Sequence, residues 1–377
     1  MVFEKFLVKL ARTAGKLTPK IEINSYYKDD IKHLKDCHQK IEEVKWTEKQ
    51  TEKFNSFWMN NYGKTIPQEG TKLFEYISGK HNDEFIPAFF YRKVIEPYFN
   101  PYYDSLAFDK KNLYEFLFGG IEGLRFPHTY LSCMNGCYRI DNDLISLEEA
   151  VEKCYNIGKA IIKPTMWTGS GRFVRSLNIV NGKDVITDEN IKEIFMTYGT
   201  DFIVQEKIIN SSLIRKISPK SLNTFRITTY ILDGKIYTSP IALRLGCGDS
   251  EVDNVCAGGL SIGVDDNGYL MPKAHNHGQS GYQEFCCHPD TKTEFEGCYV
   301  GKVELLKETV IKMHSRITFV GIVAWDLTFD DNDIPVMIEA NFLNQSVDFA
   351  QFATGESLFR DNTKKILSKL PKKDFSI

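Results

Sequence analysis

Residues 319–341 read FVGIVAWDLTFDDNDIPVMIEAN, and this stretch decides the fold of the C-terminal part. Two apolar runs, 319–329 and 335–341, lie on either side of the acidic turn Asp330–Asp333. Apolar runs of this length that flank a polar turn predict a β-hairpin. A hairpin at this place would bring side chains from both runs together on one face.

Three oxygen-bearing side chains belong to this hairpin: Asp326, Glu339 and Asn341. Because side chains alternate along a strand, Glu339 and Asn341 share a face and Asp326 can stand opposite them. Carboxylate and amide oxygens are hard donors that suit Mg2+ bridging nucleotide phosphates. The alternative is an ordinary solvated hairpin face, which the motifs upstream disfavour.

A lysine strand and a glycine-rich turn lie upstream. Ile161-Ile162-Lys163-Pro164 carries the lysine, and Thr168-Gly169-Ser170-Gly171 leads into another expected strand at 173–180. Glycines let backbone N–H groups approach phosphate oxygens, and a lysine supplies a point charge. The turn is neither a Walker loop, which needs Gly-Lys-Ser/Thr, nor a dinucleotide fingerprint, because no helix follows it. Taken alone, it could be a plain hairpin turn.

The order of these motifs carries a resemblance. A lysine strand, a glycine loop, a further strand at 202–208 and the oxygen-bearing hairpin follow one another. In this order the chain resembles the ATP-grasp superfamily, and within it the sugar-transfer associated branch found among genes for surface polysaccharides. The resemblance covers roughly residues 105–370. It implies an α+β fold in which two subdomains with antiparallel sheets clasp ATP, preceded here by a helical N-terminal region.

The resemblance also implies the cofactors ATP and Mg2+ and the residues that hold them. Lys163 would contact the α and β phosphates, the glycine loop would cover the β and γ phosphates, and the 202–208 strand would end in a hinge that reads the adenine edge. The cofactor-binding set is Lys163, Gly169, Ser170, Gly171, Gln205, Glu206, Lys207, Ile208, Ile209 and Asn223. The metal set is Asp326, Glu339 and Asn341.

Two positions depart from the pattern of the superfamily. Dipeptide ligases place an arginine two residues before the metal-binding aspartate, whereas this chain has Ala324. Many members carry an acid after the hinge to hold the ribose, but the segment Asn210-Ser211-Ser212-Leu213 has none. The ribose contact is therefore unassigned, and the work of the arginine must fall to another residue.

Two arginines on neighbouring expected strands can replace the missing one. In Ser221–Tyr230, alternation puts Arg226 on one face, inside a family-like Asn-Thr-x-Arg segment, and a second strand at 237–245 presents Arg244. Two guanidinium groups can clamp an anionic transition state bidentately, which lysine cannot do. We therefore expect Arg226, Arg244 and Lys163 to be catalytic. The alternative is that both arginines are salt-bridge partners at a sheet edge.

The segments that follow offer substrate contacts. Five residues could approach or orient an acceptor: Asp253, Asn254, Gly258, Gly259 and His275. A loop that needs unusual dihedral angles explains the glycines equally well. The histidines and cysteines at 275–288 lack the regular spacing of a zinc site, so an ordinary polar loop is the alternative for His275.

Composition limits the class of protein. The 377 residues are 42% hydrophobic and 26% charged, which describes a well-cored soluble protein. No run of 18 apolar residues exists, and the net charge of −3 gives no general attraction to nucleic acid. The chain has nine cysteines, an odd number, and no signal-peptide pattern. We therefore expect reduced thiols and a cytoplasmic location.

The N-terminal region has a helical pattern. One face of the first helix is apolar and carries Phe3, Phe6, Leu7 and Leu10. The remainder of this helix is basic and carries Lys5, Lys9, Arg12 and Lys16. Such a helix could pack on its own domain or rest at the inner membrane surface. Further helices should bury Trp46, Phe54, Phe57 and Trp58.

These patterns predict three parts. Residues 1–105 form the helical region and its connector (85–108), residues 106–200 the part with the lysine strand and glycine loop, and residues 201–377 the part with hinge, arginine strands and hairpin. The helices expected beyond the N-terminal region lie at 146–157, 188–198, 301–315 and 356–369.

The leading functional hypothesis is an ATP-dependent, ADP-forming carboxylate–amine ligase that works through an acyl phosphate. By resemblance, its partners are ATP, an amine and the carboxylate of a uronic acid or amino acid of a surface glycan. One alternative is a kinase that phosphorylates a small molecule or sugar. The other is a nucleotide-binding module without turnover in glycan assembly, which the complete metal and lysine set disfavours.

Overall fold

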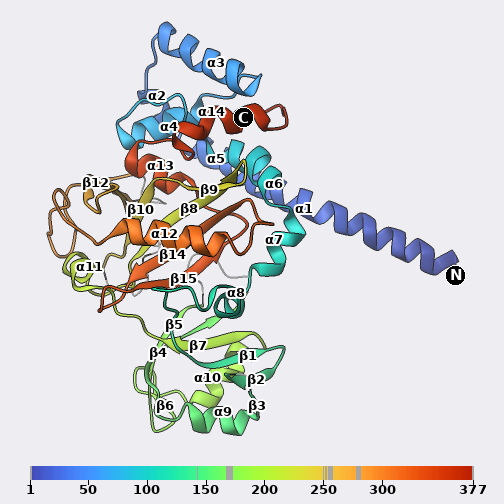
Figure 1. Ribbon diagram of the computed structural model, residues 1–377, viewed down its shortest axis with the longest axis vertical. Helices are drawn as coiled ribbons and strands as arrows, with labels where there is room; N and C mark the ends of the chain where they lie inside the picture. Colours follow the sequence, from blue (N-terminus) through green and yellow to red (C-terminus); the bar gives the residue numbers. More distant parts are fainter. Residues whose placement is uncertain are drawn as a thin grey trace.

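The computed structural model describes residues 2–141, 143–166, 173–248, 250, 253, 258–276 and 282–375, with side chains from residue 17 onward. Figure 1 shows a smaller lobe built around one sheet, a larger lobe built around a second sheet, and a helical region on the far side of the larger lobe. Both sheets are antiparallel, which confirms the expected α+β class with a helical region ahead of it.

The smaller lobe contains, within the described ranges, seven strands in the order β3-β2-β1-β7-β4-β5-β6. Their bounds are β1 Thr129–Met134, β2 Cys137–Ile140, β3 Asp143–Ile145, β4 Gly158–Pro164, β5 Arg175–Val180, β6 Lys183–Asp184 and β7 Phe202–Glu206. Helices α9 (Leu147–Lys153) and α10 (Ile191–Tyr198) share a core with one face of this sheet. The other face carries Lys163 on β4 beside Ile203 on β7. Our division at residue 200 had placed β7 in the C-terminal part, whereas it belongs to this sheet.

The larger lobe is built on a sheet whose described strands follow the order β13-β12-β11-β10-β8-β14-β15, with β9 pairing to β8 off this path. Their bounds are β8 Thr224–Leu232, β9 Lys235–Thr238, β10 Ile241–Leu245, β11 Leu260–Val264, β12 Leu270–Asn276, β13 Glu284–Phe285, β14 Ile322–Phe329 and β15 Pro335–Asn341. Helix α12 (Val303–His314) buries one face in a common core. The opposite face meets α13 (Asp348–Thr354) and the helical region.

The hairpin predicted from residues 319–341 is present as β14 and β15, joined at the expected turn. The strand expected at 237–245 is instead divided into β9 and β10. Pro240 lies at the division, and proline has no N–H to continue a ladder, so the two pieces pair with different stretches of β8.

The helical region begins with α1 (Val2–Asp36) and ends at α8. Between them lie α2 His38–Glu43, α3 Glu48–Tyr62, α4 Glu69–Ser78, α5 Ala88–Phe90, a π-helical turn Tyr91–Ile95, α6 Glu96–Phe99, α7 Tyr102–Phe108, a 3-10 turn Lys111–Leu113 and α8 Tyr114–Phe118. Phe54 and Trp58 are fully buried in the core shared with the larger lobe, as predicted, and Trp46 and Phe57 pack against it. In the described part of the chain, no helix is both long and apolar enough to cross a membrane.

Three helical expectations need correction, and one helix was not foreseen. Residues 85–108 are more than a connector, because they form helices and bury Phe85, Phe89 and Phe90 in the shared core. The helix expected at 356–369 consists of a 3-10 turn, Arg360–Asn362, followed by α14 (Thr363–Lys369). Helix α9 begins at the predicted Ser146 capping box but ends at Lys153, and α11 (Ser212–Ile217) was not foreseen.

Asn100 fastens the helical region to the hairpin. Its side-chain amide donates to the carbonyls of Ile322 (2.7 Å) and Phe342 (2.6 Å), and its oxygen accepts from the Ile322 N–H at 2.8 Å. Asn100 is 2% exposed, so water cannot replace these bonds. One buried amide therefore satisfies three backbone groups at the ends of β14 and β15.

Replacing Asn100 should destabilise the whole protein. Asn100→Ala would leave three buried backbone groups without partners, and we expect the free energy of unfolding to fall by about 2–4 kcal/mol. Urea denaturation followed by circular dichroism measures this change. Asn60→Ala, at an exposed position of α3, is the control and should change it little. Equal stability of the two variants would contradict the role given to Asn100.

Candidate functional site

A cavity of about 350 Å³ lies between the two sheets. The smaller lobe contributes Lys163 and the end of β7, and the larger lobe contributes side chains of β8, β10, β14 and β15. Among the described residues, seven basic and four acidic side chains line it, a net charge of +3 in a chain whose net charge is −3. The cavity is therefore suited to a polyanion.

The structure brings most of the predicted site residues to this cavity. Those that line it are Lys163, Gln205, Glu206, Lys207, Ile208, Ile209, Arg226, Arg244, Asp253, Asp326, Glu339 and Asn341. Asn223, Gly258, Gly259 and His275 are not among the lining residues. Gly169, Ser170, Gly171 and Asn254 lie outside the described residues.

His275 is 5% exposed on β12, with its ring 6.2 Å from that of Phe352 on α13. Burial lowers the pKa of the imidazole. The structure thus places His275 under α13 and away from the cavity lining, which differs from the substrate-facing position we expected.

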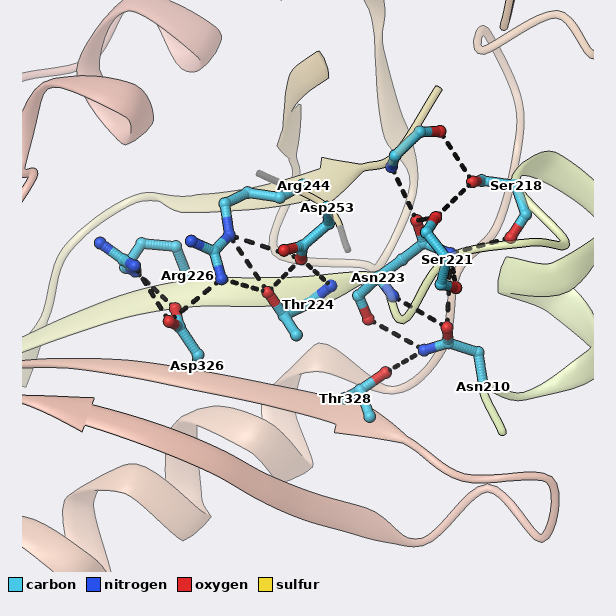
Figure 2. Close-up of polar contacts among 11 residues, drawn as sticks. Asn210, Ser218, Ser221, Asn223, Thr224, Arg226, Arg244, Asp253, Asp326 and Thr328 are labelled. Atoms are coloured by element: carbon cyan, nitrogen blue, oxygen red, sulfur yellow. Dashed lines mark hydrogen bonds and ion pairs between the residues drawn. The ribbon is translucent and has the colours of Figure 1, made fainter. Parts of the chain in front are cut away.

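Asp326 lies between two guanidinium groups, as Figure 2 shows. Arg226 binds it through two bonds, Nε to Oδ1 at 2.5 Å and Nη2 to Oδ2 at 3.0 Å, and Arg244 Nη2 lies 3.0 Å from Oδ2. The three residues stand on β14, β8 and β10, so the cluster links three adjacent strands. Burial alone would raise the Asp326 pKa, but the two arginines outweigh it and hold the pKa below its usual value.

Asp253 fixes Arg244 from the other side (Figure 2). Its carboxylate accepts from the Thr224 N–H at 2.8 Å and from the Thr224 hydroxyl, and it lies 3.5 Å from Arg244 Nε. The Thr224 hydroxyl in turn accepts from Arg244 Nη2 at 2.6 Å. Burial raises the pKa of Asp253, and the negative charges of Asp253 and Asp326 raise that of Arg244 against the opposing effect of burial. Arg244 is therefore held from both ends.

Asn223 belongs to a buried amide network behind the cavity (Figure 2). It is 0% exposed, and its oxygen accepts from the Ser221 hydroxyl (2.8 Å) and the Gly246 N–H (3.0 Å). Asn210 Oδ1 accepts from the Asn223 N–H at 2.9 Å, and Asn210 Nδ2 donates to the Asn223 carbonyl at 2.9 Å and to Thr328. The network ties the chain just after the hinge to the start of β8. From the sequence, we considered Asn210 only as part of a segment that lacks an acid to hold the ribose.

The lysine end of the cavity holds a second lysine that the sequence analysis missed. Lys111 Nζ lies 2.7 Å from Glu339 Oε1, and its side chain is 11% exposed. Lys163 has its pKa lowered to about 8, mainly by burial and further by the charge of Lys111. The run Asp109-Lys110-Lys111 was the available signal, but nothing local in it indicates a contact with residue 339.

The hinge side chains have partners of their own. Both Glu206 oxygens accept from Arg125 Nη2, at 2.5 and 2.6 Å, and Arg125 also lies 3.6 Å from Asp330 in the hairpin turn. Lys207 Nζ donates to the Ser176 hydroxyl at 3.0 Å. The Glu206 carboxylate and the Lys207 ammonium group therefore both have protein partners at the hinge.

The oxygen donors of the hairpin, Asp326, Glu339 and Asn341, are of the chemical type that binds a magnesium ion. Asp326 pairs with Glu339 across the hairpin and Ala324 with Asn341, so the three oxygen donors occupy neighbouring positions of one cavity wall. Glu339 already holds a cation, the Lys111 ammonium. Among the described residues no cluster of three His, Cys, Asp or Glu side chains has the arrangement of a metal site, and the third donor here is an amide.

A lysine and a hinge strand on one antiparallel sheet face acidic and basic groups on a second antiparallel sheet across the cavity. A family model described as sugar-transfer associated ATP-grasp matches residues 91–366, so the chain belongs to that family. No match is found among curated proteins.

Similar solved structures include the VanG D-Ala:D-Ser ligase from Enterococcus faecalis, an L-amino acid ligase from Bacillus licheniformis, and the ATP-grasp ligase PsnB complexed with minimal precursor, Mg and ADP. Sequence identities are 13%, 12% and 10%, and TM-scores are 0.39, 0.36 and 0.40. The matches cover 70%, 70% and 72% of this chain and 60%, 48% and 61% of the other chains. At these values they carry no argument about substrate.

The two acidic hairpin residues should respond differently to loss of charge. Asp326→Asn would leave two buried guanidinium groups without their shared counter-ion, and we expect the free energy of unfolding to fall by about 3–5 kcal/mol. Glu339→Gln, at a half-buried position, should leave stability nearly unchanged. Thermal and urea denaturation measure both.

Nucleotide affinity should depend on the protonation of Lys163. Its free-state pKa is about 8, and phosphates favour the charged form, so binding takes up a proton above that pH. The Kd of a non-hydrolysable ATP analogue should be flat below about pH 8 and rise by up to about tenfold per pH unit above it. Calorimetry across this range tests the slope. In Lys163→Arg the side chain stays charged over this range, so the rise of Kd with pH should disappear. An unchanged slope in that variant would contradict the role given to Lys163.

Proposed function

We propose that this protein is an ATP-dependent, ADP-forming carboxylate–amine ligase that makes an amide through an acyl phosphate. The observation that carries the proposal is the pair of arginines, Arg226 buried and Arg244 half-buried, that Asp326 holds at one wall of a cavity whose opposite wall bears Lys163 and the hinge. Family membership supports ATP as the nucleotide, and the description of the family supports a sugar-linked substrate. A uronic acid or an amino acid of a surface polysaccharide would supply both the carboxylate that a ligase needs and the link to a sugar.

Each group has a role that follows from its position. The backbone after β7 would bind the adenine edge, and Lys163 with Lys111 would neutralise the phosphates. Asp326, Glu339 and Asn341 would hold Mg2+, which supplies charge neutralisation between the phosphates. Arg226 and Arg244 would bind the phosphoryl group as it moves, because planar guanidinium groups match its equatorial oxygens.

The bond changes need positioning more than a protein nucleophile. A substrate carboxylate oxygen attacks the γ phosphorus, and the bond to the β–γ bridging oxygen breaks to release ADP. The amine nitrogen then attacks the acyl carbon, and inorganic phosphate leaves with the C–O bond electrons. The described lining of the cavity contains no cysteine or histidine, which agrees with catalysis by orientation and electrostatics.

Asp253, Thr224 and Asn223 would act as positioning residues. Asp253 and Thr224 hold Arg244, and the Asn210–Asn223 pair fixes the distance between the hinge and β8. We expected Asn223 to contact the cofactor and Asp253 to contact the acceptor. The contacts support a positioning role for Asn223, which is not among the lining residues, whereas Asp253 both lines the cavity and holds Arg244.

A substrate panel tests the ligase directly. The protein would be incubated with ATP, Mg2+, uronic acids or amino acids, and amines, with phosphate release and product mass recorded. An amide should appear only when carboxylate and amine are both present, and Glu339→Gln should abolish it. A phosphorylated product that accumulates without any amine would replace the ligase by a kinase.

A further inference from the structure

The first helix leaves the body of the protein. Figure 1 shows the N-terminal half of α1 running away from both lobes, whereas Ile31 and Leu34 in its C-terminal half are buried in the shared core. Glu22 accepts hydrogen bonds from the Tyr102 hydroxyl and from Asn344, so α1 contacts the body from about this point onward. Residues 2–21 would then reach about 30 Å beyond that contact at 1.5 Å per residue.

An apolar stripe remains uncovered where α1 leaves the body. Leu17 is 47% exposed and Ile21 is 66% exposed, and a separation of four residues puts them on the same helical face. In the sequence, Phe3, Leu7 and Leu10 precede them at the three- and four-residue spacing of one stripe. A projecting helix of this kind gains little stability from helix propensity alone. Contact of its apolar face with a binding partner would stabilise it.

The charge of this segment opposes that of the remaining chain. Residues 2–21 contain five basic residues and one acid, a net charge of +4, in a chain whose net charge is −3. The rest of the chain therefore carries −7, from 42 basic and 49 acidic residues. A basic segment on an acidic body is drawn to an anionic surface while the body is repelled from it.

We propose that residues 2–21 of α1 bind the surface of an anionic lipid bilayer and hold the catalytic lobes beside it. The apolar stripe would enter the boundary between headgroups and acyl chains, and the lysines and arginine would lie at the headgroup phosphates. An anionic lipid interface offers both an apolar layer for the stripe and negative charge for the basic residues, whereas a second copy is shown to offer only the negative charge of its body. The inference is independent of the ligase proposal, since it uses no residue of the cavity.

Vesicle flotation of the full-length protein tests the proposal. The protein should float with vesicles of phosphatidylcholine and phosphatidylglycerol, should not float with phosphatidylcholine alone, and should be released by salt. Leu17→Ser with Ile21→Ser should reduce the partition coefficient by at least about tenfold. Lys9→Gln, Arg12→Gln and Lys16→Gln together should reduce it by about a hundredfold.

Matched controls separate binding from folding and from self-association. Met59→Ser, at a 50% exposed apolar position of α3, should leave flotation unchanged, and every variant should keep the parent's unfolding midpoint. Equal binding to neutral vesicles, or none to anionic vesicles, would overturn the proposal. So would a concentration-dependent dimer, seen by light scattering, that the same α1 substitutions abolish while flotation is absent.

Discussion

The shared carboxylate of Asp326 holds the centre of the larger lobe together. It joins β14 to β8 and β10 through Arg226 and Arg244, at a position 1% exposed to solvent. Burying three charged groups carries a large desolvation cost, and only close pairing offsets it. The side-chain positions are thus narrowly defined. Protein carboxylates hold both guanidinium groups in place, and such preorganisation is what the proposed stabilisation of a moving phosphoryl group would require.

A second layer of polar contacts keeps this cluster in register with the nucleotide end of the cavity. Asp253 and Thr224 restrain Arg244, and the Asn210–Asn223 pair joins the chain after the hinge to the start of β8. Arg125 links Glu206 at the hinge to Asp330 in the hairpin turn. Buried hydrogen bonds and the half-buried Arg125 ion pairs therefore join the hinge to the strands that carry the arginines.

Local sequence patterns were enough for several of the elements but not for their partners. The hairpin, the lysine strand and the capping box of α9 follow from alternation and turn chemistry within about a dozen residues. The pairing of Lys111 with Glu339 and of Arg226 with Asp326 joins residues 100 or more positions apart, and no local rule indicates such contacts. The division at Pro240 was predictable from the missing N–H. The burial of His275 depends on the packing of α13, which lies more than 70 residues further along the chain, so no local pattern predicts it.

We propose that Arg226 and Arg244 bind the transferring phosphoryl group and are not merely structural partners of Asp326. The most direct measurement compares nucleotide affinity with turnover in Arg226→Lys, a change that keeps the charge and removes the planar fork. We expect a Kd for an ATP analogue close to that of the parent and a fall in Mg2+-dependent turnover of at least about a hundredfold. A folded variant with the parent's turnover would contradict it.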